Sequence, residues 1–426
     1  MFLTHSRSTL HTADGITILD LHEETHFQTG YAYGALLAAA GHPAVSLLRN
    51  RLVSLILFLA ERLLRRRFRS ITVPEEYLNE LRGMAAAAAI PFTSLYFINF
   101  CFDILKSLGF HCSTFTFVNR DGVLAGRNTD LYPLLARLAI KFAPPAIVTV
   151  RIPGRRAFSH ATLPFFLGVI NGFNEESIAV CTHQIISVKE NAPGKRLASP
   201  LLARMILEQA GTGADAAVVI RDQPIVRSLN VMVISGSEQT STVYELNPLA
   251  VNIIPQEGQF SCCATHFTGK DTACLHHGPI EASRVRLASL SGMLQNRGEL
   301  SVPVATGILQ DTRNGMQNDY SGYSMTNNGT YQSMVMDLAE RVFYLSTGNS
   351  IPVSLSGRYA RISVLDQPQC IMVPTIKVPV THECHPSHCC IVALNGSASM
   401  PHCARVQSPA AVPRSPLAEP LQGAHN

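Results

Sequence analysis

The chain has 426 residues, of which 46% are hydrophobic and 15% are charged, and its formal net charge is +4. This length can bury a large core and form one or two domains, whereas so small a charge does not indicate a nucleic-acid-binding protein. The sequence contains no Trp and only 7% aromatic residues, so it predicts no stacking platform for bases either.

The N-terminal residues lack the basic region and the apolar stretch of a standard signal peptide, so a cytoplasmic location is the default expectation. The 11 cysteines are odd in number and irregularly spaced, which argues against a disulfide framework. The composition therefore does not predict a small secreted domain held together by disulfides.

Residues 1–111 are predicted to be mostly helical. Gly30 and Gly34 form a G-x-x-x-G pattern that allows a second helix to pack closely. Residues 45–69 combine an apolar run, Leu52–Ala60, with an arginine-rich end. The run is far shorter than the ~20 residues that span a bilayer, and the pattern is typical of a helix on an anionic membrane surface. A buried helix with solvated arginines is an equally good alternative.

A β-hairpin is predicted over residues 111–130. It consists of a β-branched and aromatic strand, Thr114–Val118, then an Arg-Asp-Gly turn and a second apolar run. Because a hairpin brings its two outer ends together, Cys112 is expected near Arg127 and Asp130, although 15 and 18 residues separate them in the sequence.

A cysteine beside a cation and a carboxylate is a recognisable chemical arrangement. The thiolate is the nucleophile, and a positive charge such as that of Arg127 lowers the pKa of the thiol. No histidine is an obvious base, but the α-amino group of Cys112, with an unperturbed pKa of about 8, would serve if the chain were cut between His111 and Cys112. Asp130 would then hold the new amine. The alternative is a buried core cysteine beside an ordinary turn.

The sequence Cys112-Ser113-Thr114, followed by Gly126-Arg127-Asn128-x-Asp130, resembles the nucleophile hairpin of the N-terminal-nucleophile amidohydrolases. The most similar branch contains penicillin acyltransferase, acid ceramidase, N-acylethanolamine amidase and the choloylglycine hydrolases. Further segments resemble this family in the same order along the chain, from about Gly30 to Gly348.

The resemblance implies further site residues. Gln184 lies about ten residues after Asn174, where relatives have the amide that donates to the oxyanion. Thr265 lies where relatives have the Asn of a T-N-H-F segment. Asn171 begins an Asn-Gly pair that predicts a type I′ turn. The residues implied for the substrate or its pocket are Asn171, His266 and Arg284.

The fold that the resemblance implies is α+β, a four-layer αββα sandwich with a helical N-terminal prosegment. Residues 1–111 are expected to be this prosegment, which becomes the small subunit after self-cleavage. Residues 112–365 are expected to be the catalytic domain, and 366–426 a tail. Composition alone predicts a mixture of helices and many short strands.

The implied activity is that of a zymogen that cleaves itself and then hydrolyses a linear amide through a Cys112 thioester. The substrate is expected to be a small-molecule N-acyl amide, and the apolar prosegment favours a fatty acyl group; no metal or other cofactor is required. Two alternatives stay open: an acyltransferase that passes the acyl group to an amine, and a non-enzymatic membrane-surface protein that uses residues 45–69.

The tail changes in character at about Asp366, where prolines recur. Residues 382–403 contain four His and four Cys, a density that suits zinc but a spacing that matches no standard ligand motif. A flexible tail is therefore favoured over a metal site.

Overall fold

The computed structural model describes residues 1–105, 111–187, 194–278, 280–315 and 322–365, and these belong to one compact unit. The predicted tail and its Cys/His cluster lie outside the described residues, as do residues 106–110 ahead of the predicted cleavage point. The division of the chain at residues 111 and 112 concerns cleavage and stays a prediction.

A ten-stranded sheet contains strands from both sides of residue 111, in the order β1-β2-β3-β7-β8-β9-β10-β12-β13-β14. Its neighbouring strands are antiparallel except for β3 and β7, which run parallel and join the N-terminal strands to the later ones. The strands are β1 (Phe2–His5), β2 (Ser8–Ala13), β3 (Ile16–His22), β7 (Ala146–Arg151), β8 (Phe158–Thr162), β9 (Asn171–Asn174), β10 (Ile178–Gln184), β12 (Leu229–Ser235), β13 (Thr240–Asn247) and β14 (Ala250–Pro255).

Residues 1–105 are mostly helical, as predicted for residues 1–111, but residues 2–22 form three strands that were not predicted from the sequence. Strand β3 buries Ile16 and Ile18 in one core cluster and Leu19 and Leu21 in another. A strand that is covered on both faces needs such a nearly continuous apolar run, which periodicity does not distinguish from a short buried helix.

A six-stranded sheet, in the order β15-β5-β6-β16-β17-β18, contains the predicted hairpin. Strands β5 and β6 pair in register from His111 and Asp130 to the turn at Asn119 and Gly122, which confirms the hairpin. The strands are β5 (His111–Asn119), β6 (Gly122–Asp130), β15 (Phe260–Cys263), β16 (Thr330–Asp337), β17 (Val342–Ser346) and β18 (Tyr359–Ser363); β4 (Ile71–Thr72) and β11 (Arg196–Leu197) form a separate parallel pair.

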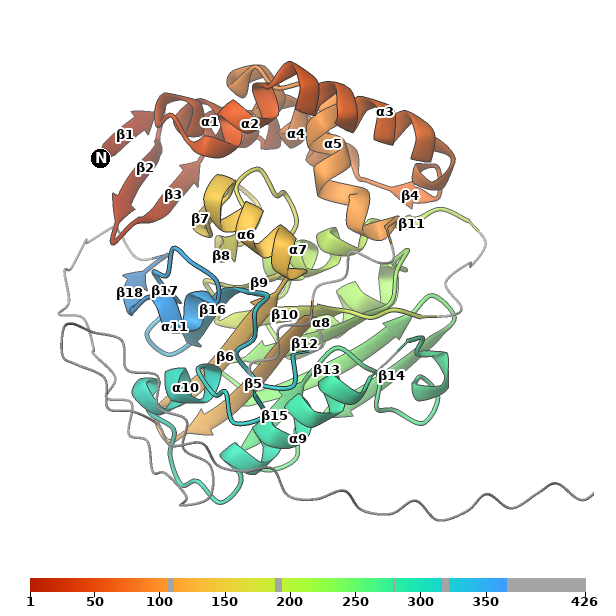
Figure 1. The fold of residues 1–426 in the computed structure, drawn as a ribbon, viewed down its shortest axis with the longest axis vertical. Helices are drawn as coiled ribbons and strands as arrows, with labels where there is room; N and C mark the ends of the chain where they lie inside the picture. Colours follow the sequence, from red (N-terminus) through yellow and green to blue (C-terminus); the bar gives the residue numbers. More distant parts are fainter. Residues whose placement is uncertain (106–110, 188–193, 279, 316–321, 366–426) are drawn as a thin grey trace, which may run out of the picture. The chain divides into compact units, whose positions relative to one another are not determined.

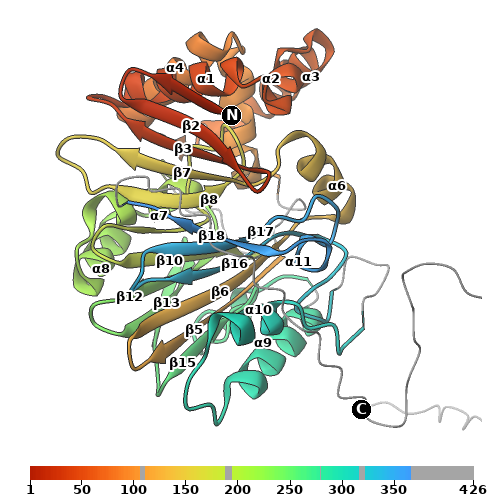
Figure 2. The ribbon, with the colours of Figure 1, turned by 90° about the vertical axis from the view of Figure 1, so that its left-hand side faces the viewer.

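The two sheets pack face to face, and helices cover their outer faces. One core cluster draws residues from both sheets, for example Ala125 of β6 and Ala179 of β10. A second cluster lies between the ten-stranded sheet and the N-terminal helices, and a third joins Phe115 of β5 to Leu290 of α9 (Glu281–Leu294). Figure 1 shows helices α1–α5 (residues 26–100) on one side of the sheets, and Figures 1 and 2 show α9 and α10 (Val302–Leu309) on the other. The predicted αββα sandwich is therefore confirmed.

The described helices fall before and after the hairpin. The earlier ones are α1 (His26–Ala39), α2 (Pro43–Arg49), α3 (Arg51–Phe68), α4 (Glu75–Ala88), α5 (Phe92–Phe100) and the 3₁₀ turn η1 (Cys101–Asp103). The later ones are α6 (Pro133–Phe142), α7 (Ser199–Gln209), α8 (Gly213–Asp222), η2 (Ala273–Leu275), α9 (Glu281–Leu294), α10 (Val302–Leu309) and α11 (Val353–Ser356).

Helices α1 and α4 pack closely because glycines line their contact. A Cβ atom on Gly30 would lie 1.9 Å from the carbonyl oxygen of Glu80, and one on Gly34 would lie 2.6 Å from that of Met84. Real Cβ atoms do not approach backbone this closely, so larger residues would push the helices apart. The predicted role of the G-x-x-x-G pattern in close packing is confirmed.

The Asn171-Gly172 pair does not form the predicted turn. Both residues lie within β9, which pairs with β8 and β10. A Cβ atom at Gly172 would lie 2.4 Å from the carbonyl oxygen of Ser159 on β8. This glycine therefore permits a close approach of two strands, and the turn to β10 instead includes Ser177, whose φ is +60°.

Candidate active site

Strand pairing places Cys112 and Arg127 on the same face of the hairpin. Cys112 lies opposite Thr129, and Thr114 lies opposite Arg127. Directly opposed residues share a face, and Ala125, two residues before Arg127, faces the core between the sheets. The thiol and the guanidinium are therefore both buried on the inner face, each with 0% exposure.

Arg127 contacts neutral acceptors alone. Its Nε donates to Thr129 Oγ1 at 3.1 Å, its Nη1 to Thr114 Oγ1 at 3.1 Å, and its Nη2 to the carbonyl oxygen of Thr182 at 2.6 Å. No described carboxylate forms an ion pair with it. A buried positive charge that no contacting anion neutralises is available to stabilise a negative charge nearby.

The Cys112 thiol experiences opposing effects. Burial raises its pKa above the usual value, and the charge of Asp130 acts in the same direction. The charge of Arg127, a hydrogen bond from the Asp130 backbone N–H, and the charge of Arg286 all lower the pKa. Burial has the largest effect, so the pKa of the thiol in the intact chain lies above its usual value.

The Asp130 carboxylate lies on the opposite face of β6 from Arg127, since successive side chains alternate. It accepts hydrogen bonds from Thr330 Oγ1 at 2.7 Å and from Asn327 Nδ2 at 2.8 Å. Burial raises its pKa to about 6, while the charge of Arg286 and these hydrogen bonds lower it. His111 lies opposite Asp130 across the hairpin, and burial lowers the pKa of its ring to about 4.

The raised pKa of Asp130 gives a prediction for stability against pH. A folded-state pKa of about 6, against an ordinary value of 3.8, favours the protonated form on folding. That contribution is complete below pH 3.8 and is lost as the pH rises through about 6. At pH 8 we expect the free energy of unfolding of Asp130→Asn to exceed that of wild type by up to ~3 kcal/mol. At pH 4 we expect the two free energies to be nearly equal. Urea unfolding at both pH values measures this.

Asn fits this site because the Thr330 hydroxyl can rotate to accept a hydrogen bond from the new amide. Asp222→Asn is the control, since Asp222 forms an exposed surface pair with Arg221. An Asp130→Asn gain that is equal at pH 4 and pH 8 would contradict the burial argument.

Two arginines of α9 differ in burial. Arg284 is exposed and is not a lining residue of the pocket described below, so its implied role stays a prediction. Arg286 is 1% exposed; its Nε donates to Ser113 Oγ at 3.0 Å and its Nη2 to Thr265 Oγ1 at 3.4 Å, and Nη1 donates to the Gly322 carbonyl. A sequence signal exists, because Ser283 and Arg286 are three residues apart and share a helix face.

Arg284 and Arg286 provide a matched pair of variants. Arg286→Gln is expected to lower kcat for the amide reaction by about tenfold, because the buried charge of Arg286 favours the ionised forms of both Cys112 and Asp130 from the other face of β5. Arg284→Gln is expected to remain within about twofold of wild type, because an exposed charge is screened. Steady-state kinetics of the two variants side by side check this, and equal losses would show that α9 does not present Arg286 to the site.

Thr265 and His266 join the same cluster as Arg286. His266 Nδ1 lies 2.7 Å from Ser283 Oγ, and Thr265 Oγ1 lies 3.3 Å from the same oxygen. Burial lowers the pKa of His266 to about 4, so its ring is neutral near pH 7. These residues are linked to the hairpin through Arg286 and Ser113, on the face opposite Cys112.

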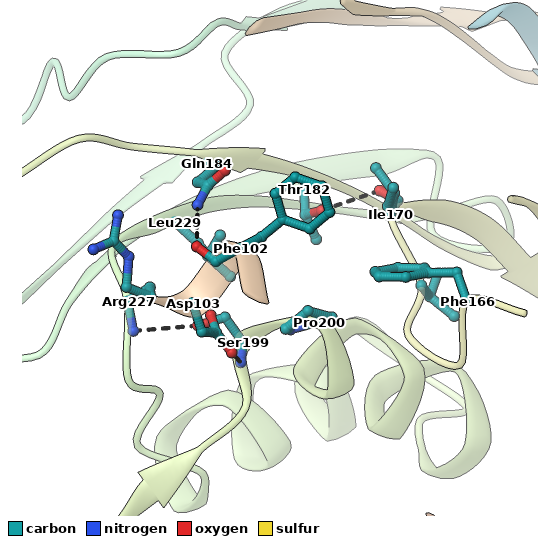
Figure 3. Close-up of a pocket in the computed structure, with 11 residues that line it drawn as sticks. Phe102, Asp103, Phe166, Ile170, Thr182, Gln184, Ser199, Pro200, Arg227 and Leu229 are labelled. Carbon is teal, nitrogen blue, oxygen red and sulfur yellow. Dashed lines mark hydrogen bonds between the residues drawn. The ribbon is translucent and has the colours of Figure 1, made fainter. Parts of the chain in front are cut away.

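The side-chain amides of Gln184 and Asn171 both donate hydrogen bonds in the intact chain. Gln184 Nε2 donates to the carbonyl oxygen of Phe102 at 2.9 Å (Figure 3). Asn171 Nδ2 donates to Gln332 Oε1 at 2.7 Å across the gap between the sheets. Gln332 lies opposite Thr129, which lies opposite Cys112, so Asn171 contacts the row of side chains that contains the thiol.

A mostly apolar pocket shares two of its lining residues with the core cluster that contains Cys112. These two residues are Phe166 and Ile170. Figure 3 shows these two side chains at one end and Gln184 and Arg227 at the other. The lining residues are Phe102, Asp103, Phe166, Val169, Ile170, Thr182, Gln184, Ser199, Pro200, Arg227 and Leu229. Within the described part of the chain, no group of three or more His, Cys, Asp or Glu side chains is placed to hold a metal ion.

Comparisons with known proteins give a family. No curated protein matches the sequence. The model of the family described as acyl-coenzyme A:6-aminopenicillanic acid acyl-transferase matches residues 118–351, which is more than half of the chain. The match includes Arg127, Asp130, Gln184 and Arg286, and it begins six residues after Cys112.

Solved structures of related enzymes resemble the chain at low identity. The N-acylethanolamine-hydrolyzing acid amidase ortholog of Caenorhabditis elegans is 17% identical, with a TM-score of 0.38, and the match covers 54% of this chain and 93% of that one. Penicillin V acylase from Agrobacterium tumefaciens is 13% identical, with a TM-score of 0.37, and the match covers 60% of this chain and 87% of that one. A variant of the conjugated bile acid hydrolase of Clostridium perfringens is 12% identical, with a TM-score of 0.39, and the match covers 59% of this chain and 92% of that one.

The matched residues include strands of both sheets of the αββα architecture. The chain therefore belongs to the acyl-coenzyme A:6-aminopenicillanic acid acyl-transferase family of N-terminal-nucleophile enzymes, and it is an amide hydrolase or acyltransferase that acts on carbon–nitrogen bonds.

Proposed function

We propose that the protein is a cysteine amidohydrolase that activates itself by cleavage between His111 and Cys112 and then hydrolyses a linear N-acyl amide. The observation that carries this proposal is the placement of Cys112 on the same face of the hairpin as an Arg127 that contacts no described carboxylate. Cys112 also packs in one core cluster with Phe166 and Ile170, which line an apolar pocket. A thiol next to an unneutralised cation is the usual environment of a nucleophilic cysteine.

The proposed reaction has two halves. The Cys112 thiolate attacks the amide carbonyl carbon, the C–N bond breaks, and the freed amine takes a proton from the α-ammonium group of Cys112. Water then adds to the thioester, gives a proton to the same α-amine and releases a carboxylic acid. The Gln184 amide is the proposed oxyanion donor, and its present acceptor, the Phe102 carbonyl, belongs to the segment before the cleavage point.

The proposed substrate is a small N-acyl amide whose acyl group is apolar. Phe166, Val169, Ile170 and Leu229 are apolar lining residues of the pocket, and Phe166 and Ile170 also pack in the core cluster of Cys112. Apolar walls with a few polar groups at one end suit a hydrocarbon chain joined to a polar amide.

Intact-mass and N-terminal peptide analysis of purified protein tests the proposal. Active material is expected to contain fragments of 111 and 315 residues, with Cys112 at the start of the larger one. The same sample is then assayed against N-acyl amides with acyl chains of graded length. Fully active protein without a chain that begins at Cys112 would contradict the proposal.

The second candidate is acyl transfer from the same thioester, and the description of the matched family favours it. An amine that excludes water from the thioester would receive the acyl group. Adding hydroxylamine to the amide assay separates the two, because a transferase forms hydroxamate at the expense of the free acid.

The chain belongs to an enzyme family, so the alternative of a non-enzymatic membrane-surface protein no longer applies. We propose instead that this enzyme contacts membranes through α3. Leu55, Ile56, Leu59 and Leu63 are between 52% and 84% exposed, and Phe68 is the one buried residue of this helix. The alternative of a buried helix is therefore wrong. Exposed arginines follow the apolar stripe, which suits an anionic lipid surface: Arg62, Arg65, Arg66, Arg67 and Arg69.

The chain shows no single described helix long and apolar enough to cross a membrane, although α2 and α3 together pass on length and composition with a 68° bend. Co-sedimentation with vesicles of phosphatidylcholine, with and without phosphatidylserine, tests the α3 surface. The protein is expected to bind only the vesicles that contain phosphatidylserine. This binding is expected to fall when Arg65, Arg66 and Arg67 are replaced by Gln. Binding that these substitutions leave unchanged would contradict the proposal.

A further inference from the structure

His183 lies in the layer between the sheets and contacts the residues that hold Arg127. It is on β10 with 0% exposure. Its Nε2 lies 2.9 Å from Thr114 Oγ1 and 3.5 Å from Arg127 Nη1, and its Nδ1 lies 3.4 Å from Cys263 Sγ. The imidazole therefore bridges β10 of one sheet to β5 and β6 of the other.

The hydrogen-bonding chemistry of the partners fixes the state of this ring. Arg127 Nη1 is a donor without acceptor capacity, and it also donates to Thr114 Oγ1. The Nε2 atom that faces both must therefore accept, and the Thr114 hydroxyl proton is directed at it. The single ring proton then lies on Nδ1 and points toward Cys263 Sγ. Burial and the charge of Arg127 hold the pKa of His183 well below its usual value, in agreement with a neutral ring.

A neutral acceptor here has a chemical consequence. Buried arginines are commonly paired with carboxylates, which would cancel the charge at the site. Arg127 instead contacts a ring nitrogen, two hydroxyl oxygens and one backbone oxygen. We infer that His183 is a positioning residue: its neutral imidazole holds the Arg127 guanidinium beside Cys112 without neutralising it, so that the full positive charge remains available to the thiolate. This inference rests on the proposed role of Cys112.

Gln and Glu at position 183 form a matched pair for the test. Both place an oxygen near the position of Nε2, and they differ in charge alone. His183→Gln is expected to keep kcat and KM within about threefold of wild type. His183→Glu is expected to lower kcat at least tenfold with KM within about twofold, because an ion pair with Arg127 removes the charge from the thiolate.

The decisive readout is the rate of iodoacetamide alkylation of Cys112 against pH, followed on the Cys112 peptide of the cleaved protein. The charged and titratable groups around this thiol are Arg127, Arg286, Asp130 and Cys181. The midpoint is expected to rise by about one pH unit or more in His183→Glu and to stay near wild type in His183→Gln. Coincident midpoints for the two variants, or a wild-type Cys112 that does not react at any pH, would overturn the inference.

Two further observations keep the result clear. The ¹⁵N shifts of His183 in wild-type protein should report a neutral ring with the proton on Nδ1 from pH 5 to 9; a protonated ring or the other tautomer overturns the inference even if a variant does not fold. The midpoints depend on the thiol and not on turnover. The protein could show the expected alkylation midpoints for both variants and yet cleave no amide. That result would refute the proposed function but would still support the role of His183.

Discussion

A Cys112→Ala variant is expected to remain a single 426-residue chain and to lose amide-cleaving activity by ~10⁴-fold or more. The substitution removes the sulfur atom that is proposed to form both the self-cleavage intermediate and the thioester. Cys112 is fully buried among apolar side chains, and Ala keeps that packing except for the sulfur. Denaturing electrophoresis, intact mass and steady-state kinetics on one preparation measure both losses.

Two controls frame this result. Cys112→Ser retains a weaker nucleophile, so slow cleavage at the same bond is expected over hours to days. Cys274→Ala changes an exposed thiol and is expected to behave as wild type. A Cys112→Ala protein that is cut at residue 111 or hydrolyses amides normally would assign the chemistry to another group.

The largest expected loss of stability follows from replacing Arg204 on α7. This residue is 1% exposed; its Nη2 lies 2.6 Å from Glu80 Oε2 and its Nε lies 2.8 Å from Glu208 Oε1. Tyr77 donates to Glu208 at 2.7 Å, and His26 Nδ1 lies 2.9 Å from Glu80 Oε2. Arg204→Met leaves two buried carboxylates without their cation, so we expect the free energy of unfolding to fall by about 3–5 kcal/mol. Urea unfolding measures it.

The same network crosses the proposed cleavage point. Glu80 precedes residue 111, whereas Arg204 follows it, and they form an ion pair in the core. The two fragments of wild-type protein are therefore expected to elute together in gel filtration, and the 111-residue fragment of cleaved Arg204→Met is expected to separate. Arg221→Met is the control, because the side chain of Arg221 is 71% exposed. An Arg204→Met protein as stable as Arg221→Met would contradict the burial argument.

The pairing of Cys112 with Arg127 could be predicted because it depends on local chain direction. Alternation of apolar residues and a short turn fix the hairpin register, and the register places Thr114 opposite Arg127. The same register predicts that Asp130 lies at the end of the hairpin near Cys112. The alternation of side chains along β6, however, directs the Asp130 carboxylate to the face opposite Arg127. The function of the Asn171-Gly172 pair was not predictable, because a close approach between strands and a tight turn both favour glycine.

The neighbours from distant segments could not be predicted in the same way. Arg284 and Arg286 differ in the sequence by two positions, and the rotation of α9 against β5 determines which of them is buried. His183 is a single histidine on a buried strand until the second sheet brings Thr114 and Arg127 to its ring.

Short-range sequence patterns were thus sufficient for the hairpin of β5 and β6 and for the close helix pair of α1 and α4. The charge state of the site depends on atoms that meet only when the two sheets pack, because burial and hydrogen-bond partners change ionisation energies far more than sequence neighbours do. The absence of a described carboxylate partner for Arg127 and the neutral ring of His183 belong to that second group.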